Sequence, residues 1–354
     1  MSGLDFWHPV LKTSDVGRGC VKGIKLAGHS LAVFRAANGQ LGAIEDRCVH
    51  RRMKLSAGKV EGDRLVCSYH GWSFTTDGQG RSPSTPYMHA CVDSLECADA
   101  HGAIWIKRPG LAQPFPAPGI EGWESAGIVI NRIQVPLELV IDNFSEVEHT
   151  VAAHPDFGFD VTQAGKVALQ IESGDDWVTV RNEGPAKMPP ITTRVMAFVR
   201  PGDQFHSNYT FRFDPPRSSV SHFWTNPAGR ERMSKYHLFH YFVPEDEANT
   251  LVVTFGFFQS RWPLFPHYGQ YLGRFVRRKI RTTVDEDARI LENLADRSTL
   301  LDGMKLSRFD RVLGMTRERI RRVYRGENGV QPQDSHACSS PPPGELEPSI
   351  GSAR

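Results

Sequence analysis

Hydrophobic and polar residues alternate in short runs along the first hundred residues of the chain. The runs cover residues 30–36, 41–46, 64–70 and 102–108, and glycine, aspartate or asparagine separates them. Alternation with a period of two is typical of strands with one buried face, and the separating residues are typical of turns. The pattern therefore predicts a small all-β domain in this part of the chain.

The pattern changes after a proline-rich segment at residues 108–119. Proline fixes one backbone dihedral and cannot donate to a sheet ladder, so we interpret this segment as a linker. Beyond it, the sequence predicts a helix over residues 138–155, several long strands, and two helices over residues 268–296 and 308–325. Long strands together with separate helices predict an α+β second domain.

These patterns divide the chain into three parts. We expect the all-β domain at residues 1–111 and the α+β domain at residues 112–327. Residues 328–354 are rich in proline, serine and glycine and poor in aromatic residues. Such a composition cannot bury enough apolar surface to fold, so we expect a disordered tail.

Composition and charge add little to this picture. The chain has 354 residues, 40% of them hydrophobic, which is enough to form two cores of ordinary size. The 42 lysines and arginines nearly balance the 40 aspartates and glutamates, so charge gives no indication of nucleic acid as a partner. No basic leader with an apolar stretch and no run long enough to span a bilayer is found. We therefore expect a cytoplasmic protein without a membrane span.

Two cysteines and two histidines are spaced like metal ligands. Cys48 and His50 form C-x-H, and Cys67 and His70 form C-x-x-H further along. Zinc accepts mixed sulfur and nitrogen ligands, but its structural sites favour a C-x-x-C half. A [2Fe–2S] cluster with two thiolates on one iron and two imidazoles on the other needs one cysteine and one histidine from each of two loops. The spacing therefore favours such a cluster over zinc.

The four residues, with the Gly71-Trp72 pair that follows them, resemble the Rieske motif. Membrane respiratory Rieske proteins have additional disulfide-forming cysteines where this chain has Met53 and Tyr69, so the chain resembles the soluble type. A lone ferredoxin of that type would end with the first domain. Here a second domain is predicted, which indicates an oxygenase in which the cluster supplies electrons to another metal.

A second group of candidate ligands lies in that domain. Asn143, Glu146 and His149 recur every three residues, which would place them on one face of the predicted helix. His154 precedes a proline, where that helix should end. Two imidazoles would therefore converge near the helix end. A mononuclear iron site with two histidines needs one carboxylate more.

Asp287 is the best candidate for that carboxylate. The hydrophobic residues of the predicted helix form one stripe, which consists of Ile280, Val284, Leu291 and Leu294. Asp287 falls on this stripe, and a carboxylate facing a core needs a partner such as a metal ion. Asp285 and Glu286 belong to other faces, and we expect them to be solvated.

From Phe6 to Arg325 the chain resembles the catalytic α subunit of a Rieske non-heme iron oxygenase. The resemblance implies a helix-grip-like second domain, an antiparallel sheet with helices. It also implies that His149, His154 and Asp287 bind a mononuclear Fe(II).

The resemblance further implies a role for Glu146 and Asn143, which belong to the same sequence pattern as the iron histidines. Most members have aspartate at the position of Glu146. There it connects an iron-ligating histidine to a cluster histidine of the neighbouring subunit in a homotrimer. A glutamate keeps the carboxylate but changes the length of the connection.

The implied reaction needs electrons from outside the chain. A partner reductase would pass them from NAD(P)H and flavin to the cluster, directly or through a ferredoxin, and O2 would react at the iron. The chain shows no G-x-G-x-x-G after a strand, so nicotinamide and flavin are expected only on the partner. We favour monooxygenation of a small, largely apolar substrate, with demethylation as one outcome. Ring dioxygenation, and a Rieske electron carrier without catalysis, stay open as alternatives.

Several aromatic residues in the predicted strands can either line an apolar pocket or pack in the core. They are Phe211, Phe213, Phe223, Trp224, Phe255 and Phe257. His237 and His240 fall on opposite faces of a predicted strand, so we do not expect them to bind one metal together.

Overall fold

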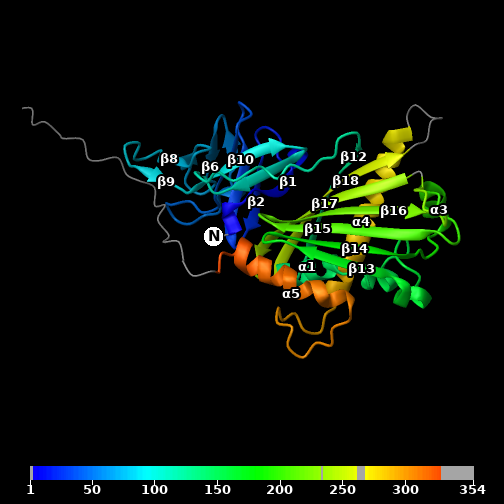
Figure 1. The fold of residues 1–354 in the computed structure, drawn as a ribbon. Helices are drawn as coiled ribbons and strands as arrows, with labels where there is room; N and C mark the ends of the chain where they lie inside the picture. The colour runs from blue at the N-terminus through cyan, green and yellow to red at the C-terminus, as the bar shows by residue number, and fades with distance from the viewer. Residues whose placement is uncertain (1–2, 233, 261–267, 328–354) are drawn as a thin grey trace, which may run out of the picture.

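A computed structural model of the chain describes residues 3–232, 234–260 and 268–327. It contains an N-terminal β domain, blue to cyan in Figure 1, beside a larger sheet with helices, green to orange. The predicted tail lies outside the described residues, and the domain boundary at residue 111 stays a prediction. Among the residues described, no helix has both the length and the apolar character that crossing a bilayer requires.

The N-terminal domain is built from two antiparallel sheets, which confirms the predicted all-β domain. In spatial order, the first sheet contains β1 (His8–Lys12), β11 (Ala103–Lys107), β10 (Ser94–Ala100), β4 (Leu41–Glu45), β3 (His29–Arg35) and β2 (Val21–Leu26). The second sheet contains β5 (Lys59–Glu61), β6 (Arg64–Val66), β7 (Ser73–Phe74), β8 (Gln79–Arg81) and β9 (Ala90–Cys91). The four candidate cluster ligands lie in the loops that precede β5 and follow β6.

The second domain is organised around one antiparallel sheet of seven strands. In spatial order, these are β12 (Glu124–Ile133), β18 (Asn249–Ser260), β17 (Ser234–Asp246), β16 (Pro216–Thr225), β15 (Gln204–Phe213), β14 (Trp177–Pro185) and β13 (Ala168–Ser173). Strand β15 shows why the sequence forms this sheet, because every second residue from Phe205 to Phe213 is buried. The sheet with its helices confirms the predicted α+β class.

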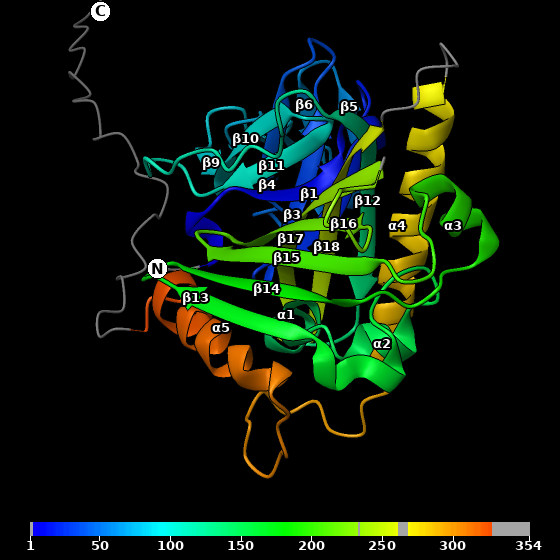
Figure 2. The same cartoon turned by 45° about the vertical axis from the view of Figure 1, so that its right-hand side comes forward.

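The helices of this domain pack along the sheet. They are α1 (Leu137–Ser145), α2 (His149–Ala153), α3 (Ile191–Ala197), α4 (Tyr268–Glu292) and α5 (Leu313–Arg319), which continues as a π-helical turn, η6 (Ile320–Tyr324). The short 3₁₀ helices are η4 (Val161–Lys166) and η5 (Phe309–Val312) in this domain, and η1 (Gly3–Asp5), η2 (Thr13–Asp15) and η3 (Leu55–Ala57) in the N-terminal domain. Figure 2 shows α4 running along the sheet beside β12, with α2 near one end of α4. Gly256 permits this packing, since a Cβ there would lie 2.4 Å from Ile280 Cδ1.

The prediction of a single helix over residues 138–155 is wrong. Helix α1 ends at Ser145, and Glu146 has an extended backbone with φ −111° and ψ 156°. The Glu146 carboxylate accepts hydrogen bonds from the backbone N–H groups of Glu148 and His149, at the start of α2. The side chain thus satisfies N–H groups that a helix start leaves without partners, which stabilises the break.

The two domains share a hydrophobic core. Strand β17 directs Tyr241 and Val243 towards the N-terminal domain, where Trp105 of β11 is fully buried. The ring centre of Trp105 lies 5.0 Å from that of Tyr241 and 5.7 Å from that of Phe255. Aromatic contacts of this kind stabilise a junction beyond the area they bury. The opposite face of the sheet packs against α1, α4 and α5 and contains the site described next.

Candidate metal centres and substrate cavity

The two candidate cluster loops have the same backbone arrangement. In each, the cysteine carbonyl accepts a hydrogen bond from the N–H four residues later, Arg52 at 2.8 Å and Gly71 at 3.1 Å. Both residues adopt positive φ, 59° for Arg52 and 71° for Gly71. Glycine adopts this conformation without steric cost, whereas for Arg52 the conformation carries a steric cost. The pair of tight turns brings the cysteine and histidine of each loop to one end of the domain.

The donor set at these loops fits a Rieske cluster. Cys48 and Cys67 are buried, and burial raises the pKa of the Cys48 thiol. His50 and His70 are exposed, and their ring centres lie 4.5 Å apart. A [2Fe–2S] group held here would have its sulfur-ligated iron inside and its histidine-ligated iron towards the surface. Trp72 stacks on His50 at 5.1 Å and covers one side of the ring.

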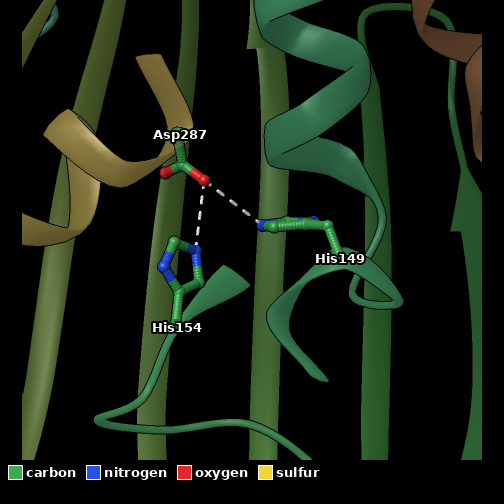
Figure 3. A group of neighbouring side chains, drawn as sticks. All are labelled: His149, His154 and Asp287. Atoms are coloured by element: carbon green, nitrogen blue, oxygen red, sulfur yellow. Dashed lines mark ion pairs between the residues drawn. The ribbon is translucent and has the colours of Figure 1, made fainter. Parts of the chain in front are cut away.

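The second candidate centre brings together His149, His154 and Asp287, as predicted (Figure 3). Asp287 Oδ1 lies 3.1 Å from His154 Nε2 and 3.5 Å from His149 Nε2. All three donor atoms lie within 4.8 Å of one another. Asn143 donates a hydrogen bond to the same Asp287 oxygen at 3.1 Å, so the predicted Asn143 also belongs to the site.

The remaining ring nitrogens of the two histidines are bonded to carboxylates. His149 Nδ1 lies 2.6 Å from Glu146 Oε1, and His154 Nδ1 lies 2.9 Å from Glu286 Oε2. A carboxylate at Nδ1 fixes the ring and leaves Nε2 free to bind a metal. The expectation that Glu286 is solvated is therefore wrong. Asp285 is half-buried and accepts a hydrogen bond from Asn131 at 2.6 Å, so it is only partly solvated.

The chemistry of these donors fits a mononuclear Fe(II). Two imidazoles and one carboxylate on one side leave the other side open, which is the two-histidine, one-carboxylate arrangement of non-heme iron sites. Burial lowers the pKa of His154, but hydrogen bonds and charge from Asp287 and Glu286 outweigh burial and raise it. The site thus attracts positive charge at the position where a cation would bind.

A cavity opens directly over these three residues. The space between atoms amounts to about 1050 Å³, a figure that includes the open mouth of the cavity. Its wall is largely apolar and includes the aromatic residues Phe144, Phe157, Tyr209, Trp224, Tyr236 and Phe275. Of the six aromatic residues considered from sequence, Trp224 lines the cavity. Phe211 and Phe213 are buried in the core, Phe255 and Phe257 pack towards the N-terminal domain, and Phe223 stacks on His206.

Asp156 connects three elements at this cavity. Its Oδ1 accepts a hydrogen bond from Thr193 of α3, and both its oxygens lie 2.8 Å from Lys279 Nζ of α4. All three residues belong to the cavity lining. We call this group the Asp156 latch, since it ties α3 to α4 beside the cavity.

Two family models match the chain and together cover both candidate centres. Residues 6–98 match the Rieske [2Fe–2S] domain. Residues 133–325, more than half of the chain, match the vanillate O-demethylase oxygenase C-terminal domain. The chain belongs to the Rieske oxygenases. The resemblance inferred from the sequence is thereby confirmed.

Curated Rieske oxygenases are similar to this chain over part of its length. Methylxanthine N1-demethylase NdmA of Pseudomonas putida is 31% identical over 177 residues, 45% of this chain and 49% of that protein. The 4beta-methylsterol monooxygenase of Methylococcus capsulatus is 34% identical over 166 residues, 42% of this chain and 44% of that protein. Chlorophyllide a oxygenase of Arabidopsis thaliana is 32% identical over 157 residues, 42% of this chain and only 29% of that protein. The chain thus matches less than half of the length of these relatives.

Solved Rieske oxygenase structures have the same fold over nearly the whole chain. Dicamba monooxygenase bound to dicamba gives a TM-score of 0.73 at 18% identity, covering 92% of this chain and 98% of that one. A variant of Pseudomonas putida NdmA with caffeine gives 0.65 at 23% identity, covering 91% of each chain. At these identities the likeness concerns the fold alone.

Sequence reasoning missed several residues of the site. Glu286 was assigned to a solvated face, and His222, Tyr209 and the Asp156 latch were not considered. Glu286 directly precedes Asp287, and that adjacency to a candidate ligand was the one signal available. The expectation that His237 and His240 lie on opposite faces of one strand is confirmed. His240 lines the cavity, whereas His237 forms hydrogen bonds with Ser219 and Ser221 on the other face of the sheet.

Proposed function

We propose that this chain is the oxygenase component of a monooxygenase that hydroxylates a small, largely apolar organic molecule. The observation that carries this proposal is an apolar cavity that ends on His149, His154 and Asp287, in a chain that also has a Rieske ligand set. When the hydroxylated carbon is an N- or O-methyl group, the product loses formaldehyde, which gives demethylation.

In this proposal Cys48, His50, Cys67 and His70 hold the [2Fe–2S] cluster. His149, His154 and Asp287 hold the mononuclear iron. Fe(II) bound there supplies the activation of O2. The balance is one C–H bond, one O2, two electrons and two protons, giving one alcohol and one water.

The surrounding side chains prepare the site for this reaction. Glu146 and Glu286 hold the two imidazoles with Nε2 pointing inwards. Asn143 orients the Asp287 carboxylate. The aromatic wall excludes water from the substrate, which strengthens the electrostatic interactions in the site.

The partners of the chain belong to the same proposal. A reductase that carries flavin and oxidises NAD(P)H, with or without a ferredoxin, would reduce the cluster. Glu146 would connect His149 to a cluster histidine of the neighbouring chain in a homotrimer. A cytoplasmic location stays a prediction.

The deciding experiment combines iron analysis with product analysis. The loaded protein should contain three irons per chain and, given NADH, a reductase and ¹⁸O2, should place one ¹⁸O atom in a methylated aromatic, N-methyl heterocyclic or sterol substrate. Two labelled atoms would instead show a dioxygenase. Two irons per chain and no product would show an electron carrier.

The variant Asp287→Ala separates the two centres. It should lose the third iron and all product while the visible spectrum of the cluster is unchanged. Asp302→Ala, at an exposed acid, is the matched control. Turnover in Asp287→Ala equal to that of the control would sink the proposed function.

A further inference from the structure

Two histidines face the cavity from adjacent strands. His222 lies on β16 and His240 on β17, and both belong to the cavity lining. His222 is paired with Tyr236 in the sheet, and His240 is paired with Ser218. Because side chains alternate along a strand, residues 222 and 218 of β16 and residues 236 and 240 of β17 share one face.

Their hydrogen bonds within the chain are incomplete. His240 Nδ1 lies 2.8 Å from Thr254 Oγ1, and no described residue bonds its Nε2. His222 contacts the rings of Phe157 and Phe205, at 5.0 and 5.4 Å, and no described residue bonds either of its nitrogens. A neutral imidazole has one N–H to donate and one lone pair to accept, and leaving them unpaired inside a protein costs free energy. Three imidazole nitrogens therefore remain for a ligand in the cavity.

Neither histidine carries charge near neutral pH. Burial lowers the pKa of His222 to about 3, with further lowering by His240 and His154. Burial also lowers the pKa of His240 to about 4. A neutral imidazole bonds a carbonyl or hydroxyl well but cannot balance the charge of a carboxylate.

Among the described lining residues of the cavity, no lysine or arginine is free to pair with an anion. Lys279 is the one lysine or arginine in that lining, and Asp156 binds its ammonium with both oxygens. The acids of the lining are Glu146, Asp156 and Asp287. Burying a carboxylate without a cationic partner is costly, so the wall away from the iron site disfavours anions.

We propose that His222 and His240 form a hydrogen-bonding subsite for an uncharged carbonyl or hydroxyl oxygen. The substrate is then a neutral, largely apolar molecule that carries such an oxygen in addition to the carbon to be oxidised. This inference rests on the proposed function, since it describes one wall of the same cavity.

Four probes with one ring system test this subsite. They are naphthalene, 2-naphthol, 2-naphthoate and 2-naphthylmethylammonium. Their dissociation constants are measured by equilibrium dialysis at pH 7 with the iron-loaded protein and no electron donor, so that no turnover occurs. One added hydrogen bond should make 2-naphthol bind about threefold to tenfold more tightly than naphthalene. The carboxylate should bind at least about tenfold more weakly than 2-naphthol, because no described lining residue offers it a free cation. The ammonium should bind at least about tenfold more weakly as well, because the three acids of the lining already pair with His149, Lys279 and His154.

The variant His222→Phe keeps an aromatic ring between Phe157 and Phe205 and removes both nitrogens. It should reduce the advantage of 2-naphthol over naphthalene to less than about twofold while naphthalene binds as before. His206→Phe is the control, because His206 stacks on Phe223 outside the cavity lining. His240→Leu tests the second ring separately, should His222→Phe fail to fold by circular dichroism.

Three results would overturn the inference. They are no measurable binding of 2-naphthol, tighter binding of either charged probe than of 2-naphthol, and an unchanged 2-naphthol preference in every histidine variant that folds. Product formation is measured separately with NADH and reductase. If the binding pattern is as expected and no product forms from any substrate, the proposed function fails and the subsite stands. If products form and the preference is unchanged, the subsite alone is wrong.

Discussion

Glu286 and Asp287, adjacent in sequence, bond opposite nitrogens of the same imidazole. Glu286 lies 2.9 Å from His154 Nδ1, and Asp287 lies 3.1 Å from His154 Nε2. One turn of α4 therefore both orients a histidine and contributes the carboxylate next to it. Glu146 has the corresponding position at His149, so each imidazole of the site has its own orienting acid.

Replacing Glu286 with glutamine should weaken iron binding. The amide carries no charge and holds the His154 ring less firmly, and changes of this kind lower metal affinity about 10-fold to 100-fold. Competition with a chelator, followed by the loss of ferrous iron, measures the affinity. Glu247→Gln, in the exposed turn between β17 and β18, is the control. Equal iron affinity in the two variants would show that Glu286 does not orient the ligand.

Replacing Glu146 should slow electron delivery even in protein loaded with its full iron content. In Glu146→Gln we expect product formation to fall by about 10-fold to 100-fold, because the amide cannot provide the charged connection. Glu146→Asp keeps the charge and shortens the side chain, so it should retain more activity than glutamine. Single-turnover kinetics with a pre-reduced cluster measure the transfer step. An unchanged rate of electron transfer from the cluster in Glu146→Gln, with normal iron content, would exclude a role of Glu146 in electron delivery.

His8 should make the stability of the fold depend on pH. It is completely buried, and burial lowers its pKa from 6.5 to about 4. Between these values the unfolded chain binds a proton that the folded chain does not, so stability is full above pH 6.5 and falls as the pH decreases towards 4. From pH 7.5 to pH 5 this residue alone should reduce the free energy of unfolding by about 2 kcal/mol.

The contribution of His8 is measured as a difference between variants, because partial or complete burial also lowers the pKa values of His222, His237 and His240. Melting temperatures are recorded at both pH values for wild type, His8→Gln and the exposed control His29→Gln. The decrease on acidification should be smaller in His8→Gln. The same decrease in all three proteins would contradict the assignment.

Breaking the Asp156 latch should change both the retention and the charge preference of the cavity. Asp156→Asn removes the carboxylate that holds Lys279, so α3 should open more easily and ligands should dissociate about threefold to tenfold faster. The released ammonium should also tighten the binding of 2-naphthoate. Stopped-flow dissociation and dialysis measure the two effects. Asp176→Asn, which loses only an exposed pair with Arg212, should show neither.

The candidate metal ligands could be proposed from the sequence because most of them are close together along the chain. Cys48 and His50, and likewise Cys67 and His70, lie on single tight turns, so their spacing reflects their geometry directly. Asp287 is distant in sequence, but its place on the apolar stripe of α4 showed that it is buried. Its partner Glu286 could not be recognised, since its contact depends on where a separate segment places His154.

Two further features could not be predicted for a related reason. They are the break between α1 and α2 and the position of His222 in the cavity. Spacing alone is compatible with one continuous helix from residue 138 to residue 155, and only the capping contacts of Glu146 show the interruption. Alternation along β16 predicts that His222 shares a face with Val220 and Trp224. It does not tell which face of the sheet lies under α4 and which lies against the first domain.

Strand β17 belongs to two surfaces at once. Tyr236, Leu238 and His240 border the cavity, and Phe239, Tyr241 and Val243 join the core shared with the N-terminal domain. Substitutions at every second residue of the strand can therefore alter which molecules fit the cavity. The residues between them have a different constraint, because they fix the N-terminal domain against the sheet.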